Sequence, residues 1–114
     1  MPPVGESGGR VEAPADGNRS GRPTHPMSQG PLSGVTVVDL TSYIAGSYAA
    51  MMLADLGADV IKVEGLEGDS FRELPGFYGW NRGKRSVAVN LKTPDGRALV
   101  HRLARRADVA MENM

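Results

Sequence analysis

The spacing of apolar and polar positions changes several times along the chain, and each change predicts an element. Residues 35–40, VTVVDL, form a mainly β-branched apolar run, which predicts a buried strand. Residues 45–59, AGSYAAMMLADLGAD, carry apolar residues at helical spacing, followed by Gly57, and predict a short helix that is apolar around most of its girth. Residues 58–64, ADVIKVE, predict the next strand. The helical apolar positions are Tyr48, Met51, Met52 and Leu56.

The second half of the pattern predicts a long loop and then a strand, a helix and a strand. Residues 65–80 hold four Gly and one Pro without a sustained period, which is typical of a loop. Residues 86–91, SVAVNL, alternate as a strand does. Thr93 as an N-cap and Pro94 in the first turn predict the start of a helix, and residues 108–113 begin a fourth strand. The apolar face of that helix is Leu99, Val100, Leu103, Ala104 and Ala107.

This order of elements predicts the fold class. Strands that alternate with helices over so few residues favour an open α/β fold, Rossmann-like, with a mainly parallel sheet and crossover helices. Because the pattern stops inside the fourth strand with no covering element after it, we expect a sheet that is incomplete at the C-terminus. Residues 31–114 would then be the amino-terminal part of a longer protein.

Residues 1–30 differ from the rest in composition. They hold six Gly and five Pro with only isolated aliphatic residues, too few to offset the entropy of ordering, so we expect a disordered tail. Met27 opens MSQGPLSG directly before the first patterned segment, which makes it a plausible start of translation. No apolar run in this tail resembles a signal peptide.

The overall charge narrows the classes of partner. Thirteen Lys and Arg balance thirteen Asp and Glu, so no global basic excess draws the chain to nucleic acid or to an anionic membrane. The chain has no cysteine, which excludes disulfides and thiolate metal sites, and a cytoplasmic location is the expectation. The longest apolar stretch, around residues 48–54, is far short of the roughly 20 residues of a membrane helix.

Two segments are candidates for binding an anion. In open α/β sheets ligands bind beyond the carboxyl ends of the strands. There the small residues Ala45 and Gly46 could bring backbone N–H groups near a phosphate, or could form an ordinary tight turn. Further along, Gly83 lies between Arg82 and Lys84, two cations that could hold a phosphate. The alternative there is a solvated turn that keeps a sheet edge charged.

The sequence offers few groups of residues that could act together in catalysis. His25 lies in the tail and His101 on an exposed helical turn, and neither has an obvious partner. No metal-ligand spacing is present, so we expect no metal site. The acidic residues near loops, Asp39, Asp55 and Asp59, are more typical of capping and turn roles than of general acid or base chemistry.

Two blocks of the sequence resemble a known family. PLSGVTVVDLTSYIAGSYAAMMLADLGADVIKVE and NRGKRSVAVNLKTPDGRALVHRLARRADVAMEN are similar to the amino-terminal part of the family III CoA-transferases, the CaiB/BaiF family. The similarity runs in order from Pro31 to Met114. It implies an α/β fold in an interlocked homodimer that moves CoA from an acyl-CoA to a small carboxylic acid. The family's nucleophilic aspartate lies beyond the matched part, so the resemblance places no catalytic residue in this chain.

The resemblance also implies where CoA or acyl-CoA would be contacted. Lys84 would be the cation at the phosphate or adenine end. Ile44 stands where some members carry a glutamine, so an oxalate or formate specificity is not expected. The residues that match the family's CoA contacts are Ile44, Ala45, Asn81, Arg82, Gly83, Lys84, Asn113 and Met114.

Two alternatives to a transferase stay open. An α-methylacyl-CoA racemase-like isomerase shares the RGKRS and DLGA blocks, but it abstracts a proton next to the thioester carbonyl. A non-catalytic CoA-binding module is the second alternative, and it would bind CoA without turnover. The sequence beyond residue 114 would separate a nucleophilic aspartate from the histidine and acid pair of a racemase.

Overall fold

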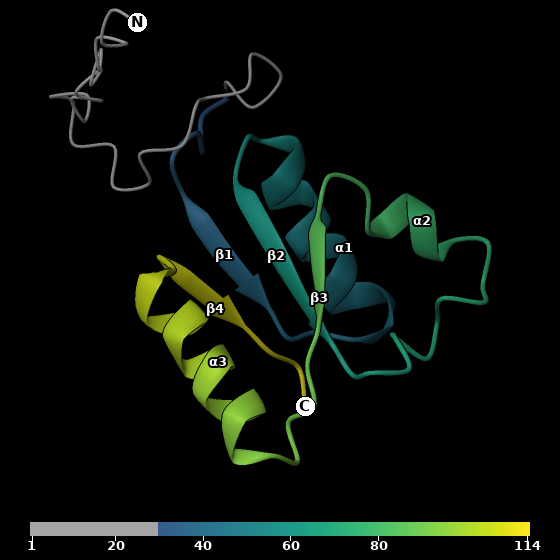
Figure 1. Ribbon diagram of the computed structural model, residues 1–114. Helices are drawn as coiled ribbons and strands as arrows, with labels where there is room; N and C mark the ends of the chain where they lie inside the picture. Colours follow the sequence, from purple (N-terminus) through teal and green to yellow (C-terminus); the bar gives the residue numbers. More distant parts are fainter. Residues whose placement is uncertain (1–29) are drawn as a thin grey trace, which may run out of the picture.

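The computed structural model describes residues 30–114, so the predictions of a disordered tail and of a start at Met27 lie outside the described residues. Within these residues four strands and three helices follow one another (Figure 1), and their order is the predicted one except that a short helix lies in the segment expected to be a loop. They are β1 (Thr36–Asp39), α1 (Tyr43–Asp55), β2 (Asp59–Glu64), α2 (Phe77–Trp80), β3 (Arg85–Ala88), α3 (Pro94–Arg106) and β4 (Val109–Met111).

The four strands form one parallel sheet in the order β3-β2-β1-β4. β1 therefore lies inside the sheet, where Val38 is level with Ile61 of β2 and Ala110 of β4. The prediction of an α/β fold with a mainly parallel sheet is confirmed. The chain moves outward from β1 to β2 and β3, then returns through α3 to the other side of β1 (Figure 1).

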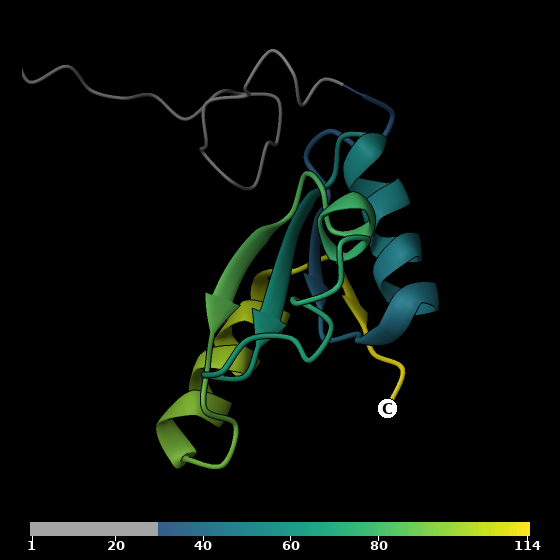
Figure 2. The same ribbon diagram turned by 90° about the vertical axis from the view of Figure 1, so that its right-hand side faces the viewer.

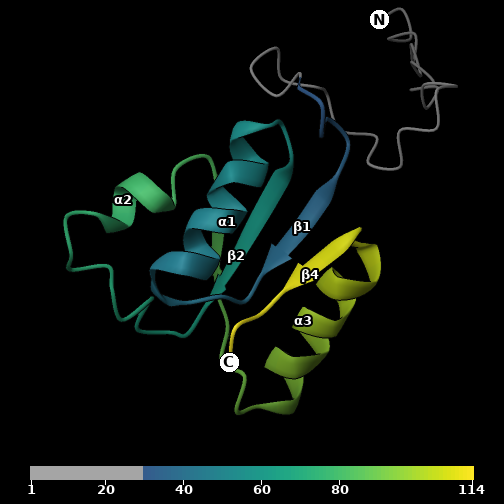
Figure 3. The same ribbon diagram turned by 180° about the vertical axis from the view of Figure 1, so that it is seen from behind.

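Helices cover both faces of this sheet. α1 and α2 lie on one face and α3 on the other, as the turned views show (Figures 2 and 3). Because side chains alternate along a strand, neighbouring valines of β1 point to opposite faces. Val37 packs with Ala50 beneath α1, whereas Val38 packs with Val100 beneath α3. The two small cores that result position the ends of β1 between the helices.

The start of α3 is the predicted one. The Thr93 hydroxyl accepts a hydrogen bond from the Gly96 N–H at 3.1 Å, and Pro94 follows the cap. Val100 is buried, with Leu99, Leu103 and Ala107 packed beside it. Ala104 is exposed, so this one position of the predicted apolar face is wrong.

The buried face of α1 differs from the face that its apolar residues suggested. Met51 is buried, but Tyr48, Met52 and Leu56 are 52%, 49% and 44% exposed. Ser47 and Ala50 are buried in their place, because small side chains let the helix lie close to the sheet. A helix that is apolar around most of its girth has no periodicity that would reveal this face.

Smaller differences concern the ends of elements. Residues 65–80 are mainly loop, but they contain the short helix α2, which the sequence analysis missed. β3 ends at Ala88, earlier than predicted, although the Val89 N–H still donates to the Glu64 carbonyl at 2.8 Å. Among the described residues, no helix is long and apolar enough to cross a membrane.

Candidate functional site

The loop between β1 and α1 is held from several sides. Asp39, the last residue of β1, is fully buried, and its Oδ1 accepts hydrogen bonds from the Thr41 N–H at 2.9 Å and from the Thr41 hydroxyl. Tyr43 then opens α1 with a positive φ of 63°, which is uncommon for a residue with a side chain. Its ring packs on Phe71 with centroids 4.6 Å apart. The backbone is therefore constrained at the carboxyl end of β1, where α/β folds bind ligands.

Lys84 reaches this loop from the turn before β3. Its ammonium lies 2.7 Å from Asp39 Oδ2, 2.9 Å from the Ser47 carbonyl oxygen and 2.7 Å from Asn81 Oδ1. The Lys84 side chain is only 2% exposed, and burial lowers its pKa although Asp39 favours the charged form. Lys84 and Asp39 are separate candidates in the sequence, and no local pattern predicts that they meet.

A second lysine supports the same loop from β2. Lys62 Nζ donates to the Thr41 carbonyl oxygen at 3.0 Å and pairs with Asp69 Oδ2 at 2.9 Å. Burial alone would raise the pKa of Asp69, but hydrogen bonds from the Phe71 N–H and from Lys62 outweigh it, so its pKa is below the ordinary value. This contact ties the long loop after β2 to the end of β1. The sequence signal for this contact is the presence of charged residues, Lys62 among them, within the otherwise apolar strand VIKVE.

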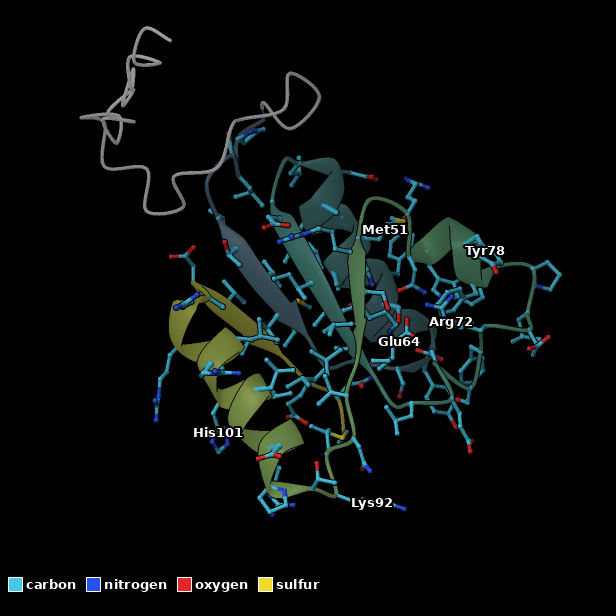
Figure 4. The ribbon with its side chains drawn as sticks, viewed as in Figure 1. Met51, Glu64, Arg72, Tyr78, Lys92 and His101 are labelled. Carbon is cyan, nitrogen blue, oxygen red and sulfur yellow. The ribbon has the colours of Figure 1, made fainter. Side chains whose placement is uncertain are left out.

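Glu64 and Arg72 form a third pair at the carboxyl end of β2 (Figure 4). Both guanidinium contacts are 2.8 Å, and the guanidinium also lies 4.9 Å from the centre of the Phe77 ring. Burial alone would raise the pKa of Glu64, but hydrogen bonds from Arg72 and the Asp69 N–H outweigh it, so its pKa is below the ordinary value. Glu64, Arg72 and Lys84 are among the residues that line a cavity of about 210 Å³ beside α2.

Some of the predicted CoA contacts come together at the start of α1. The Ser42 N–H donates to Asn113 Oδ1 at 3.0 Å, and Asn113 Nδ2 donates to the Ser42 carbonyl oxygen at 2.7 Å. This places the segment after β4 beside Ile44, which is 54% exposed, and Ala45, which is also exposed. Met114 follows and is 88% exposed.

The other predicted CoA contacts, in the turn from Asn81 to Lys84, do not lie at the start of α1. Arg82 pairs with Asp55 at the last residue of α1, with Nη2 and Oδ2 2.7 Å apart, and Gly83 adopts a φ of 76° close to Ala54. The turn thus lies near the end of α1, whereas Ile44 lies at its beginning. The buried Lys84 side chain reaches from this turn to Asp39 and to the Ser47 carbonyl oxygen, near the beginning of α1.

Other candidates from the sequence lie outside this arrangement. Asp55 and Asp59 pair with Arg82 and Arg85 at exposed positions, while His101 projects from α3 away from the sheet (Figure 4). Within residues 30–114 no three His, Cys, Asp or Glu side chains are grouped so that they could hold a metal ion.

Comparison with known proteins identifies the family. Residues 32–114 match the sequence model of CoA-transferase family III. The chain belongs to CoA-transferase family III. A succinate–glutarate CoA-transferase of Agrobacterium fabrum is 45% identical over 77% of the chain, and the human succinyl-CoA:glutarate CoA-transferase is 42% identical over 96% of it. The chain spans about a quarter of the length of these curated family III relatives, 26% in both cases.

A solved structure shows the same fold. A CaiB/BaiF family protein from Brucella suis superposes with a TM-score of 0.71 and is 43% identical, over 75% of this chain and 26% of that one. The family III resemblance seen in the sequence is therefore confirmed.

Proposed function

We propose that this chain is the CoA-binding part of an enzyme that transfers CoA from an acyl-CoA thioester to a small carboxylic acid. Family membership, with relatives named as CoA-transferases at 42–45% identity, is the observation that carries the proposal. In this proposal an aspartate outside the part of the family that this chain matches attacks the acyl-CoA carbonyl, which expels the CoA thiolate and leaves a mixed anhydride. The thiolate then attacks the aspartyl carbonyl of that anhydride, which releases the donor acid and leaves CoA on the enzyme as a thioester. The partner subunit would complete an interlocked homodimer, and the chain by itself would bind CoA without turnover.

The arrangement of exposed residues supports a CoA site along α1. Ile44 and Ala45 offer an apolar surface at its beginning, beside Asn113 and Met114. The turn from Asn81 to Lys84 lies near its other end, next to Asp55. A helix of thirteen residues is about 20 Å long. Only an elongated ligand, as CoA is, would reach both groups.

The names of the relatives favour transfer over the racemase alternative. One relative at 38% identity is named for (R)-2-hydroxy-4-methylpentanoate, but several others at 34–45% identity are named for succinate, glutarate, mesaconate or malate. We therefore propose a short dicarboxylate as the acceptor. Ile44 has an apolar side chain at the position where the resemblance would place a gating glutamine for oxalate or formate.

Isothermal titration of the folded chain with CoA tests the proposal. We expect Ile44→Glu to weaken CoA binding by about tenfold or more, because the apolar contact would be lost and a charged carboxylate would have to give up water where the ligand packs. Leu74→Glu is the matched control, because Leu74 is also exposed, at 45%, but lies in the loop before α2. A folded wild-type chain that does not bind CoA, or equal losses in the two variants, would contradict the proposed site.

A further inference from the structure

Lys84 has no hydrogen-bond donor left for a ligand. A lysine ammonium has three N–H groups, and those of Lys84 face Asp39, the Ser47 carbonyl and Asn81 at 2.7–2.9 Å. Its side chain is 2% exposed and that of Asp39 is 0% exposed. A phosphate would have to break this pair and leave the Asp39 carboxylate buried without its cation, which is strongly unfavourable.

The neighbouring cation has the opposite environment. The Arg82 side chain is 59% exposed, and its partner Asp55 is 42% exposed. Exposed ion pairs of this kind open at little cost. The turn therefore presents one cation to solvent and keeps the other inside, so a ligand phosphate at this turn would meet Arg82 and not Lys84.

The buried pair acts on the loop that precedes α1. One oxygen of Asp39 is taken by Lys84, and the other accepts the N–H and the hydroxyl of Thr41. The Ser47 carbonyl, which is part of α1, accepts a third bond from the same ammonium. Lys84 thus connects the turn before β3, the end of β1 and the beginning of α1 through one atom.

We propose that Lys84 is a positioning residue of the CoA site: through Asp39 and the Ser47 carbonyl it sets the backbone of residues 40–45, and it does not contact the phosphates of CoA. The inference rests on the proposed function, and it replaces the cation role that the family resemblance implied for Lys84. Asn81 belongs to the same hydrogen-bond network. Its side chain accepts from Lys84 and donates to the Phe77 carbonyl oxygen, and so it joins α2 to Lys84.

Three ligands separate positioning from phosphate contact. CoA, 3′-dephospho-CoA and pantetheine share the pantetheine arm but differ in their phosphates, so a lost phosphate contact lowers affinity only for the ligands that carry it. We expect Lys84→Met to weaken all three by the same factor, about tenfold. Arg82→Met, the matched control, should weaken CoA more than pantetheine. A change in the ratio of the three affinities in Lys84→Met would overturn the inference.

Rescue is the second readout. In Lys84→Met the Asp39 carboxylate is buried alone, whereas Asp39→Asn in the same chain removes that charge and keeps an acceptor for Thr41. We expect the double variant to recover affinity for all three ligands, at least about threefold over Lys84→Met. A purely structural role would alter the melting temperature without this recovery in folded protein, so double-variant affinities no better than those of Lys84→Met would overturn the inference.

If Lys84→Met does not fold, a measurement on the wild-type protein tests whether Lys84 contacts CoA. The ammonium resonance of a buried, hydrogen-bonded lysine can be followed by nitrogen-detected NMR during titration with CoA. An unchanged Lys84 signal supports positioning, and a displaced signal overturns it. A folded wild type that binds none of the three ligands would overturn the proposed function together with the inference. If the wild type binds them and Lys84→Met changes the ratio of the three affinities, the inference alone is overturned.

Discussion

At the scale of residues, the sheet face beneath α1 buries charged side chains at positions where apolar side chains are more common. Lys62, Lys84 and Glu64 each lie buried, and each meets an oppositely charged group. Removing one member of a buried pair typically costs about 3–5 kcal/mol, because the remaining charge has lost both water and partner. We therefore interpret these ion pairs as contacts that fix the positions of the loops after β1 and β2, and not as a net source of stability.

Backbone crowding at single residues leads to a prediction for Gly96. A Cβ atom at Gly96 would lie 1.9 Å from the Asn90 carbonyl oxygen, although its φ is not in the left-handed region. We expect Gly96→Ala to lower the free energy of unfolding by about 1–3 kcal/mol, because α3 must move away from the loop before it. Urea denaturation followed by circular dichroism measures the change.

Gly79→Ala is the control for this prediction. Gly79 is also helical, and nothing lies within 4 Å of the Cβ it would gain. Its effect should stay within about 0.5 kcal/mol. If the two variants were equally stable, close approach of Asn90 would not be the reason for a glycine at position 96.

At the scale of elements, one side chain hydrogen-bonds the segment after β4 to the N-cap of α1. Asn113 both accepts from the Ser42 N–H and donates to the Ser42 carbonyl oxygen, so it joins the ends of two elements that are far apart in the sequence. We expect Asn113→Ala to speed hydrogen exchange of the Ser42 amide by about tenfold, because its acceptor is lost. Mass spectrometry or NMR of exchanging amides measures this rate.

Asn113→Asp separates the acceptor from the donor. Aspartate keeps the oxygen that accepts the Ser42 N–H but loses the amide that donates to the Ser42 carbonyl. Protection of the Ser42 amide should therefore persist in this variant. Fast exchange in both variants would show that the donated bond, not the accepted one, holds the two elements together.

Elements were more predictable from the sequence than their contacts. Helix α3 has a cap at Thr93, Pro94 and a polar outer face, so both its start and its buried side follow from local signals. Helix α1 carries apolar residues on nearly every side, and the small residues that face the sheet give no such signal. The meeting of Lys84 and Asp39, 45 positions apart, depends on the order of the strands, and no local pattern contains that information.

At the scale of the molecule, Glu64 and Arg72 connect the long loop after β2 to the sheet, and this makes folding sensitive to acid. The folded-state pKa of Glu64 lies below its ordinary value of 4.5, so the unfolded chain binds more protons between these two values. The contribution of Glu64 to the free energy of unfolding is therefore complete above pH 4.5. It is lost as the pH falls through the folded-state pKa.

Arg72→Met tests this linkage, because methionine keeps an apolar contact with Phe77 but cannot donate to Glu64. The lowering of the Glu64 pKa by Arg72 is then lost, although the Asp69 N–H still donates to Glu64, so the loss of stability should begin at higher pH than in the wild type. Urea denaturation between pH 3 and pH 7 measures the profile. Arg85→Met is the control. It removes the same charge from an exposed pair with Asp59, and it should leave the shape of the stability profile against pH unchanged. Parallel profiles for the wild type and Arg72→Met would mean that the loop is held by Lys62 and Asp69 instead.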